Sequence, residues 1–336
     1  MKRQSWIILT MACLLFGCAH VSTPPQPKAD FLSIPRLQQL TFDGNSEHPR
    51  YSPDGTKIIF ASGHRNNSKG MQIYELDLTK NRERRVTFSD GDAFDPVYIS
   101  ESEIIYASTT DAIKEDFFIK VNPKLPPADL YMSDRYGMEI LRLTREPNYD
   151  GEPLYYNHPT KPFILFTSGR DNNLGIYRVD LSNMTPHPIT VRDDKHSRFP
   201  ALTPDGKSLA YVEMDNKSQE QSIVFLNTKT GKTEKIKSGE GAYRDLFFAP
   251  HSPLRLFYSV LRKGQPNYQI ESYDLEDKCT QVLFKSAESL TGPTVSSDSH
   301  EKLAFVGQFQ NKRDIYQTYV PESPGPCLES VTAKTP

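Results

Sequence analysis

Hydrophobic residues in this chain form short runs that are typical of strands. The run at residues 58–60 (Ile-Ile-Phe) is followed, after a polar loop, by residues 73–78, where every second position from Tyr74 onward is apolar. An alternation with a period of two, carried by β-branched and aromatic residues, predicts strands. The sequence Ser-Pro-Asp-Gly at residues 52–55 precedes the first run and fits a type I turn. The pattern therefore predicts strands joined by tight turns.

The same landmarks recur along the chain. A proline ends the loop before a strand at Pro49, Pro96, Pro153, Pro200 and Pro293, in steps of 47, 57, 47 and 93 residues. Leu246 divides the last step into intervals of 46 and 47 residues. The aromatic residue that ends the second strand recurs at Phe60, Tyr106, Phe166, Tyr211, Tyr258 and Phe305. The apolar residue that opens the third strand recurs at Ile73, Leu130, Ile176, Ile223, Ile270 and Ile315.

A fourth strand is expected in each copy, near Val86, Leu143, Ile189, Ile236, Val282 and Val331. Repeats of this length with four strands each are typical of propeller blades. The sequence therefore predicts an all-β fold, a six-bladed β-propeller of four-stranded antiparallel blades. Residues 37–41 also look like a strand, so seven segments compete for six outer positions. Either terminal segment could close the ring.

The second copy contains an insertion at residues 111–127. The insertion includes Phe117 and Phe118, and apolar residues in a long surface loop often mark a contact surface. Packing of the two rings on the blade beneath is the alternative.

The repeat resembles the TolB-type propeller repeat, a WD40-like unit. In the first copy the resemblance rests on Leu40-Thr41, Pro49, the Ser-Pro-Asp-Gly turn at residues 52–55, and Ile73-Tyr74. It covers nearly all of residues 36–332. It implies a six-bladed propeller that works through protein contacts rather than catalysis. TolB itself has an α/β domain before its propeller, and we do not expect that domain here, because about fifteen residues separate Cys18 from the first predicted strand.

The N-terminus has the pattern of a secretory signal. Lys2 and Arg3 precede an apolar stretch that is too short to span a membrane and that ends in Leu-Phe-Gly-Cys at residues 15–18. This ending resembles a bacterial lipobox, which implies a lipoprotein with lipid on Cys18. An ordinary signal peptide with an incidental cysteine is the alternative. Because Ala19 rather than Asp follows Cys18, the sequence favours anchoring in the outer membrane, facing the periplasm.

The predicted organisation is a signal peptide at residues 1–17, a lipidated Cys18 with a flexible tether to residue 35, the propeller at residues 36–332 and a tail at residues 333–336. The chain has 24% charged residues and a formal net charge of −2. This near-neutral balance gives no reason to expect nucleic acid or anionic lipid as a partner. We expect membrane contact through the N-terminal lipid only.

Cys279 and Cys327 remain after lipidation, and an oxidising periplasm permits a disulfide between them. If both cysteines precede fourth strands of neighbouring blades, their Cα atoms would lie beyond the roughly 7 Å limit for a bond. If the N-terminal segment closes the last blade instead, Cys327 belongs to a free tail that can reach Cys279. The sequence leaves both alternatives open.

The loops before the first strands and those between the second and third strands should converge on one mouth of the central channel. The former contribute Glu47, His48, Asp95, Glu152, Arg198, Arg244 and Asp245, and the latter contribute Arg65 and Arg170. Mixed charge at a concave mouth predicts a binding site for an envelope protein, a peptide or a glycan. Pairing of these charges with each other as structure is the alternative.

Catalytic signals are weak. The chain has no Gly-x-Ser-x-Gly elbow, His-Glu-x-x-His, Cys-x-x-Cys or P-loop motif. His48 and His196 should share one face while His158 and His251 lie on the other, which is too few for a metal site. We predict no cofactor and no metal. The sequence favours a binding scaffold; a carbohydrate lyase or hydrolase using Glu47, Asp95 and Glu152 is the rival function.

Overall fold

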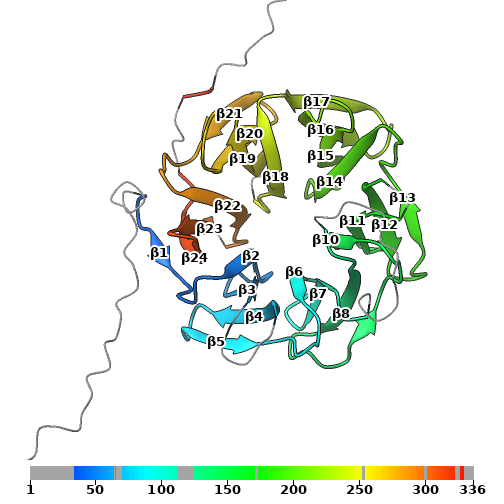
Figure 1. The fold of residues 1–336 in the computed structure, drawn as a ribbon, viewed down its shortest axis with the longest axis vertical. Helices are drawn as coiled ribbons and strands as arrows, with labels where there is room; N and C mark the ends of the chain where they lie inside the picture. Colours follow the sequence, from blue (N-terminus) through cyan, green and yellow to red (C-terminus); the bar gives the residue numbers. More distant parts are fainter. Residues whose placement is uncertain are drawn as a thin grey trace, which may run out of the picture.

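The computed structural model describes residues 34–63, 65, 70–111, 125–170, 173–251, 254–298, 301–321 and 326–328. These residues form six four-stranded sheets arranged as blades around a central axis (Figure 1). Neighbouring strands within each sheet are antiparallel. The predicted fold, an all-β six-bladed propeller, is confirmed. In the described part of the chain no helix has the length and apolar character needed to cross a membrane.

Each blade is a meander that runs from the channel outward. Blade 1 contains β2 (Ser46–Tyr51), β3 (Lys57–Ser62), β4 (Gln72–Asp77) and β5 (Arg82–Arg85). Blade 2 contains β6 (Ala93–Tyr98), β7 (Glu103–Ser108), β8 (Asp129–Asp134) and β9 (Leu141–Arg142). Blade 3 contains β10 (Asp150–Tyr156), β11 (Phe163–Ser168), β12 (Gly175–Asp180) and β13 (Pro186–Pro188).

The second half of the ring repeats this order. Blade 4 contains β14 (Lys195–Leu202), β15 (Ser208–Asp215), β16 (Gln221–Asn227) and β17 (Thr233–Ser238). Blade 5 contains β18 (Gly241–Phe248), β19 (Arg255–Arg262), β20 (Gln269–Asp274) and β21 (Cys279–Val282). Blade 6 contains β22 (Ser289–Val295), β23 (Lys302–Phe309), β24 (Lys312–Tyr319) and, from the N-terminus, β1 (Gln38–Gln39).

The N-terminal strand closes the ring. β1 pairs with β24 through Gln38↔Gln317 and Gln39↔Tyr316, so the outer position of blade 6 belongs to the N-terminal segment. This result decides between the two alternatives that the sequence left open. The other candidate strand, near Val331, lies outside the described residues, as do residues 1–33 and the insertion residues Phe117 and Phe118.

In four blades a threonine that follows the outer strand fixes this strand to the third strand by a hydrogen bond. The threonine hydroxyl accepts the backbone N–H of the apolar landmark residue in the third strand, at 2.9–3.0 Å. The acceptors are Thr41, Thr87, Thr144 and Thr190. In the Ser-Pro-Asp-Gly turn of blade 1, the Ser52 hydroxyl donates to Asp54 and accepts the N–H of Lys57, while Gly55 has a φ of +70°. Such a positive φ favours glycine.

Apolar residues pack between neighbouring blades. The aromatic landmark that ends the second strand is buried in every blade: Phe60, Tyr106, Phe166, Tyr211, Tyr258 and Phe305. One cluster joins Ile59 of β3 to Ile104 of β7, and another joins Ile105 of β7 to Phe166 of β11. Because apolar burial contributes about 25 cal/mol per Å², each blade stabilises its neighbours and the ring holds its central strands in place.

A disulfide joins Cys279 to Cys327, with their Cα atoms 5.4 Å apart. Cys279 opens β21, and the N–H of Leu328 donates to the carbonyl of Thr280 at 2.7 Å. The segment around Cys327 therefore lies against the outer edge of blade 5 rather than in blade 6. This arrangement is possible because β1 occupies the outer position of blade 6.

Candidate functional site

Each innermost strand contains a β-bulge beside the repeated proline or, in blade 5, beside Leu246. The register shifts there in all six blades, for example between Glu47 and Arg50 in β2. The bulged residues have φ values between 52° and 63°, and we call them the bulge ring: His48, Asp95, Glu152, Phe199, Asp245 and Gly292. A positive φ is uncommon for residues other than glycine, and bulges of this kind re-aim side chains. Five non-glycine residues in this conformation mark the channel as the functional candidate.

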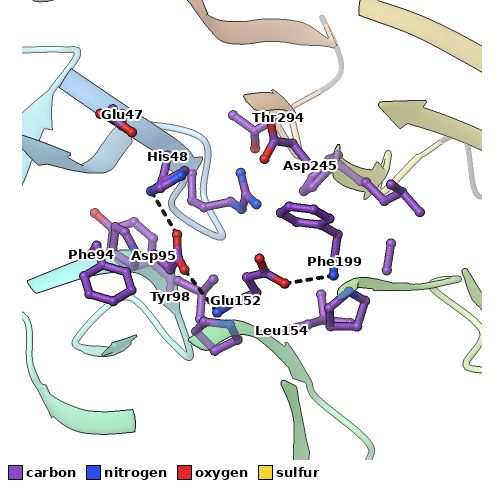
Figure 2. Close-up of a pocket in the computed structure, with 18 of the residues that line it drawn as sticks. Glu47, His48, Phe94, Asp95, Tyr98, Glu152, Leu154, Phe199, Asp245 and Thr294 are labelled. Carbon is purple, nitrogen blue, oxygen red and sulfur yellow. Dashed lines mark hydrogen bonds and ion pairs between the residues drawn. The ribbon is translucent and has the colours of Figure 1, made fainter. Parts of the chain in front are cut away.

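The bulge ring surrounds a cavity of about 580 Å³ in the centre of the propeller (Figure 2). All six innermost strands contribute lining residues, and five of the six bulge-ring residues line the cavity, glycine being the exception. A cavity of this size that combines apolar walls with a few polar groups is typical of a ligand or peptide site.

Carboxylates of the bulge ring bind the backbone of the next blade. Asp95 accepts the N–H of Glu152 at 3.1 Å, and Glu152 accepts the N–H of Phe199 at 2.9 Å (Figure 2). Asp245 accepts the N–H of Gly292 at 3.1 Å. These bonds tie blade 2 to 3, 3 to 4 and 5 to 6. The side chains of Phe199 and Gly292 have no acceptor, so this type of bond cannot form from blade 4 or blade 6.

Most charged groups of the mouth are held in ion pairs. His48 Nδ1 lies 2.9 Å from Asp95 Oδ1. Arg198 Nε donates to Glu152 at 3.0 Å, and Arg244 Nε donates to Asp245 at 2.9 Å. Glu47, which also lines the cavity, pairs with Arg313 outside the lining. Four carboxylates of the cavity lining therefore have a cation partner, and three of these cations, His48, Arg198 and Arg244, belong to the lining.

These pairs shift the pKa values of their members. Burial lowers the pKa of His48, but the charge of Asp95, with Glu47 and Asp245 adding to it, outweighs burial and raises that pKa from 6.5 to about 9. Burial alone would raise the pKa of Asp95, yet His48 holds it below its ordinary value. Arg244 and His48 likewise lower the pKa of Asp245 against burial. Both carboxyls are therefore ionised at neutral pH.

The raised pKa of His48 predicts a pH-dependent contribution to stability. Because the pKa is higher in the folded chain, the His48–Asp95 pair stabilises fully below about pH 6.5, and this stabilisation is lost as the pH rises through about 9. The difference in unfolding free energy between the wild type and His48→Asn should therefore shrink between about pH 6 and about pH 10. Urea titrations at a series of pH values measure it. A difference that stays constant or grows would contradict the ion pair.

A second layer of residues lies next to the bulge ring, and we call it the collar. In each innermost strand it consists of the residue two positions after the bulge-ring residue: Arg50, Val97, Leu154, Ala201, Phe247 and Thr294. All six residues line the cavity. Four of them are apolar, and Arg50 is the charged one. Its Nη1 donates to the carbonyl of Pro49 at 2.9 Å, and its guanidinium lies 5.8 Å from the centre of the Phe247 ring.

Seven of the nine residues predicted for the mouth line the cavity: Glu47, His48, Asp95, Glu152, Arg198, Arg244 and Asp245. The structure does not bring Arg65 and Arg170 to it. Arg65 pairs with Asp43 at 2.8 Å, and Arg170 pairs with Asp150 at 2.9 Å, each in its own blade.

Arg50, Phe199 and Phe247 line the cavity but were missed by the sequence reasoning. That reasoning looked for polar residues before each proline, whereas the two phenylalanines are apolar and Arg50 follows its proline. Their positions could have been found from the repeat, because Arg50 directly follows Pro49, Phe247 directly follows Leu246 and Phe199 directly precedes Pro200.

Asp150 and the histidines are the remaining candidates for proton transfer and metal binding. Burial raises the pKa of Asp150 to about 7, but Asp150 pairs with Arg170 and does not line the cavity. Of the four histidines that the sequence singled out, His48 lines the cavity, while His196 accepts the N–H of Leu174 at 3.0 Å. Within the described ranges, no group of three or more His, Cys, Asp or Glu residues is placed to hold a metal ion.

Fold and site together define a six-bladed β-propeller with a self-paired channel mouth. No family model matches the chain. It is 20% identical over 255 residues to the Tol-Pal system protein TolB of Francisella tularensis subsp. mediasiatica, covering 71% of this chain and 54% of the relative. The chain thus spans about half the length of the curated relatives it matches. In sequence and in fold it is a TolB-like propeller.

Solved structures show the same fold. TolB from Acinetobacter baumannii superimposes with a TM-score of 0.55 at 16% identity, over 80% of this chain and 65% of that one. An oligogalacturonate lyase in complex with manganese superimposes with a TM-score of 0.57 at 15% identity, over 85% of this chain and 80% of that one. At such identities the likeness extends to the fold alone, since propellers carry many functions.

Proposed function

We propose that this chain is a cell-envelope β-propeller that binds a protein partner at its central channel. The observation that carries the proposal is the cavity of about 580 Å³, which is bordered by bulges in all six blades and in which three bulge-ring carboxylates are paired with cations. Such a preorganised surface lowers the conformational cost of binding. The similarity to TolB supports an envelope location and makes a component of a Tol-Pal system a candidate partner. A peptide or glycan ligand would use the same cavity.

The proposal includes the N-terminal anchor. Lipid on Cys18, reached through the tether to residue 35, would hold the propeller at the outer membrane, facing the periplasm. The support is the Leu-Phe-Gly-Cys ending of the signal together with Ala19. Metabolic labelling with an alkyne fatty acid tests it: Cys18→Ser should lose the label that the wild type carries.

The rival function, a carbohydrate lyase or hydrolase, has the fold of oligogalacturonate lyase in its favour. It requires carboxyl groups that exchange protons, with pKa values moved toward neutrality. In the cavity Asp95 is ionised by its pairing with His48, while Glu152 is held by Arg198 and Glu47 by Arg313. The pairing therefore favours the binding function over acid–base catalysis.

Site-specific photocrosslinking tests the proposed function. We expect p-benzoylphenylalanine at Phe199, in the cavity wall, to crosslink an envelope protein that mass spectrometry identifies. The matched control places the same group at Tyr136, which is 62% exposed and does not line the cavity. The expected result is an adduct from position 199 and none from position 136. An adduct from position 136 alone, or none from either, would contradict binding at the channel.

A further inference from the structure

Arg50 differs from the other cations of the cavity in having no carboxylate partner. Among the described residues, no carboxylate oxygen lies within 4.0 Å of its guanidinium, whereas Arg198 and Arg244 each pair with an acid. The printed contacts of Arg50 are the hydrogen bond from Nη1 to the carbonyl of Pro49 and the ring of Phe247. Its Nε and Nη2 donors therefore remain available to a ligand in the cavity.

The acids near Arg50 are themselves paired with other cations. Burial lowers the pKa of Arg50 against the attraction of Asp245 and Asp95, which shows that the two acids compensate its desolvation only in part. Those acids are themselves neutralised by Arg244 and His48. Among the described residues that line the cavity, Arg50 is thus the cation without an ion-pair partner, and most of the collar around it is apolar.

Arg50 is only partly buried and lines the cavity, so a ligand in the cavity can reach its guanidinium. Blade 6, which lies between Arg50 of blade 1 and Phe247 of blade 5, has Gly292 in the bulge ring. No side chain at that position covers the guanidinium. A Cβ added to Gly292 would lie 3.5 Å from the ring of Pro49, beside Arg50. The absence of a side chain on Gly292 therefore leaves space beside Pro49, the residue that precedes Arg50.

We propose that Arg50 binds a carboxylate of the polypeptide that enters the channel. The proposal rests on the proposed function and names the chemistry that this function needs. A guanidinium presents a planar fork that matches a carboxylate, and it is more effective where water is excluded. The apolar collar suits the hydrocarbon part next to such a group, so the ligand is an acidic side chain or a C-terminal carboxylate flanked by apolar residues.

Defined probes test the proposal without the natural partner. Calorimetry compares N-acetyl-Leu-Phe, which has a free carboxylate, with its C-terminal amide, and with N-acetyl-Leu-Asp-Phe-amide, which has the acid in a side chain. At least one carboxylate probe should bind the wild type about tenfold or more tighter than the amide, as expected for a charged hydrogen bond. Arg50→Met should remove this preference, and Arg50→Lys, which keeps the charge but loses the fork, should retain part of it.

The control variant Lys80→Met removes a cation that is outside the cavity, and it should keep the full preference. Circular dichroism checks that each variant is folded; if Arg50→Met is not, Arg50→Lys carries the test. If the wild type binds the two carboxylate peptides no more tightly than the amide peptide, the proposal is overturned. If digalacturonate binds and neither acidic peptide does, the proposal that the carboxylate belongs to a polypeptide is wrong.

Crosslinking separates this proposal from the proposed function. If position 199 captures the partner in the wild type and equally well in Arg50→Met, the carboxylate proposal is wrong while the binding function stands. If the wild type captures no partner, the binding function fails, whatever the probes show. Loss of capture in Arg50→Met but not in Lys80→Met would support both.

Discussion

Replacing Glu152 with leucine is expected to lower the free energy of unfolding by about 3–5 kcal/mol. The Glu152 carboxylate pairs with Arg198 and accepts the N–H of Phe199 and the hydroxyl of Thr167. Its removal leaves a cation in the cavity wall without a partner and two donors without an acceptor. Breaking a buried pair on one side costs more than exchanging both members, because the remaining charge is still desolvated. Urea unfolding with an analysis of midpoint and slope measures the effect.

The double variant Glu152→Leu/Arg198→Leu provides the control for this interpretation. It should recover part of the stability lost by Glu152→Leu, because neither charge remains. Glu234→Leu, which removes one member of the exposed pair with Lys278, should change stability little. The single variant Arg198→Leu completes the comparison. If the losses of stability in Glu152→Leu and Arg198→Leu add up to the loss in the double variant, the pair has no coupling energy and its structural role is refuted.

Removing the disulfide is expected to cost about 4 kcal/mol of unfolding free energy, from the loop-closure entropy of a 48-residue separation. The enclosed loop contains β22, β23 and β24, the three strands that chain continuity gives to blade 6. The closing strand β1 is only two residues long. The bond between Cys279 and Cys327 therefore limits the opening of the blade at which the ring is joined.

The variant Cys279→Ser/Cys327→Ser tests this contribution while leaving no free thiol at either position. It should unfold at lower urea concentration than the wild type, and a reductant should shift the wild type toward it. The same reductant should have no effect on the variant. Equal stability of the oxidised wild type and the variant would show that β1 and core packing hold blade 6 without the bond.

The fold could be predicted from the sequence because each blade repeats the same local chemistry. The aromatic landmark is a core residue in every blade, and the threonine after the outer strand fixes this strand in four of them. The prolines located the channel mouth because each follows a bulge. Where the proline is missing, at Leu246, the bulge at Asp245 persists. The repeat pattern therefore located the innermost strands even where one landmark had changed.

Details of the site depend on side-chain contacts that the repeat does not encode. Arg65 and Arg170 occupy the loops that were expected to face the mouth, yet each is held within its own blade by acids and two aromatic rings, two acids for Arg65 and one for Arg170. Arg50 stands out only when the partners of every other cation are known. The disulfide, likewise, could be decided only after β1 was placed in blade 6.

Hydrogen–deuterium exchange on the purified complex with the partner crosslinked from position 199 tests the central claim most directly. The account predicts that the partner protects amides in the bulge segments of the innermost strands, including residues 45–50 and 92–97, and leaves the outer strands β5, β9, β13, β17 and β21 unchanged. Protection confined to the outer strands, with the channel segments exchanging as in the free protein, would contradict binding at the channel.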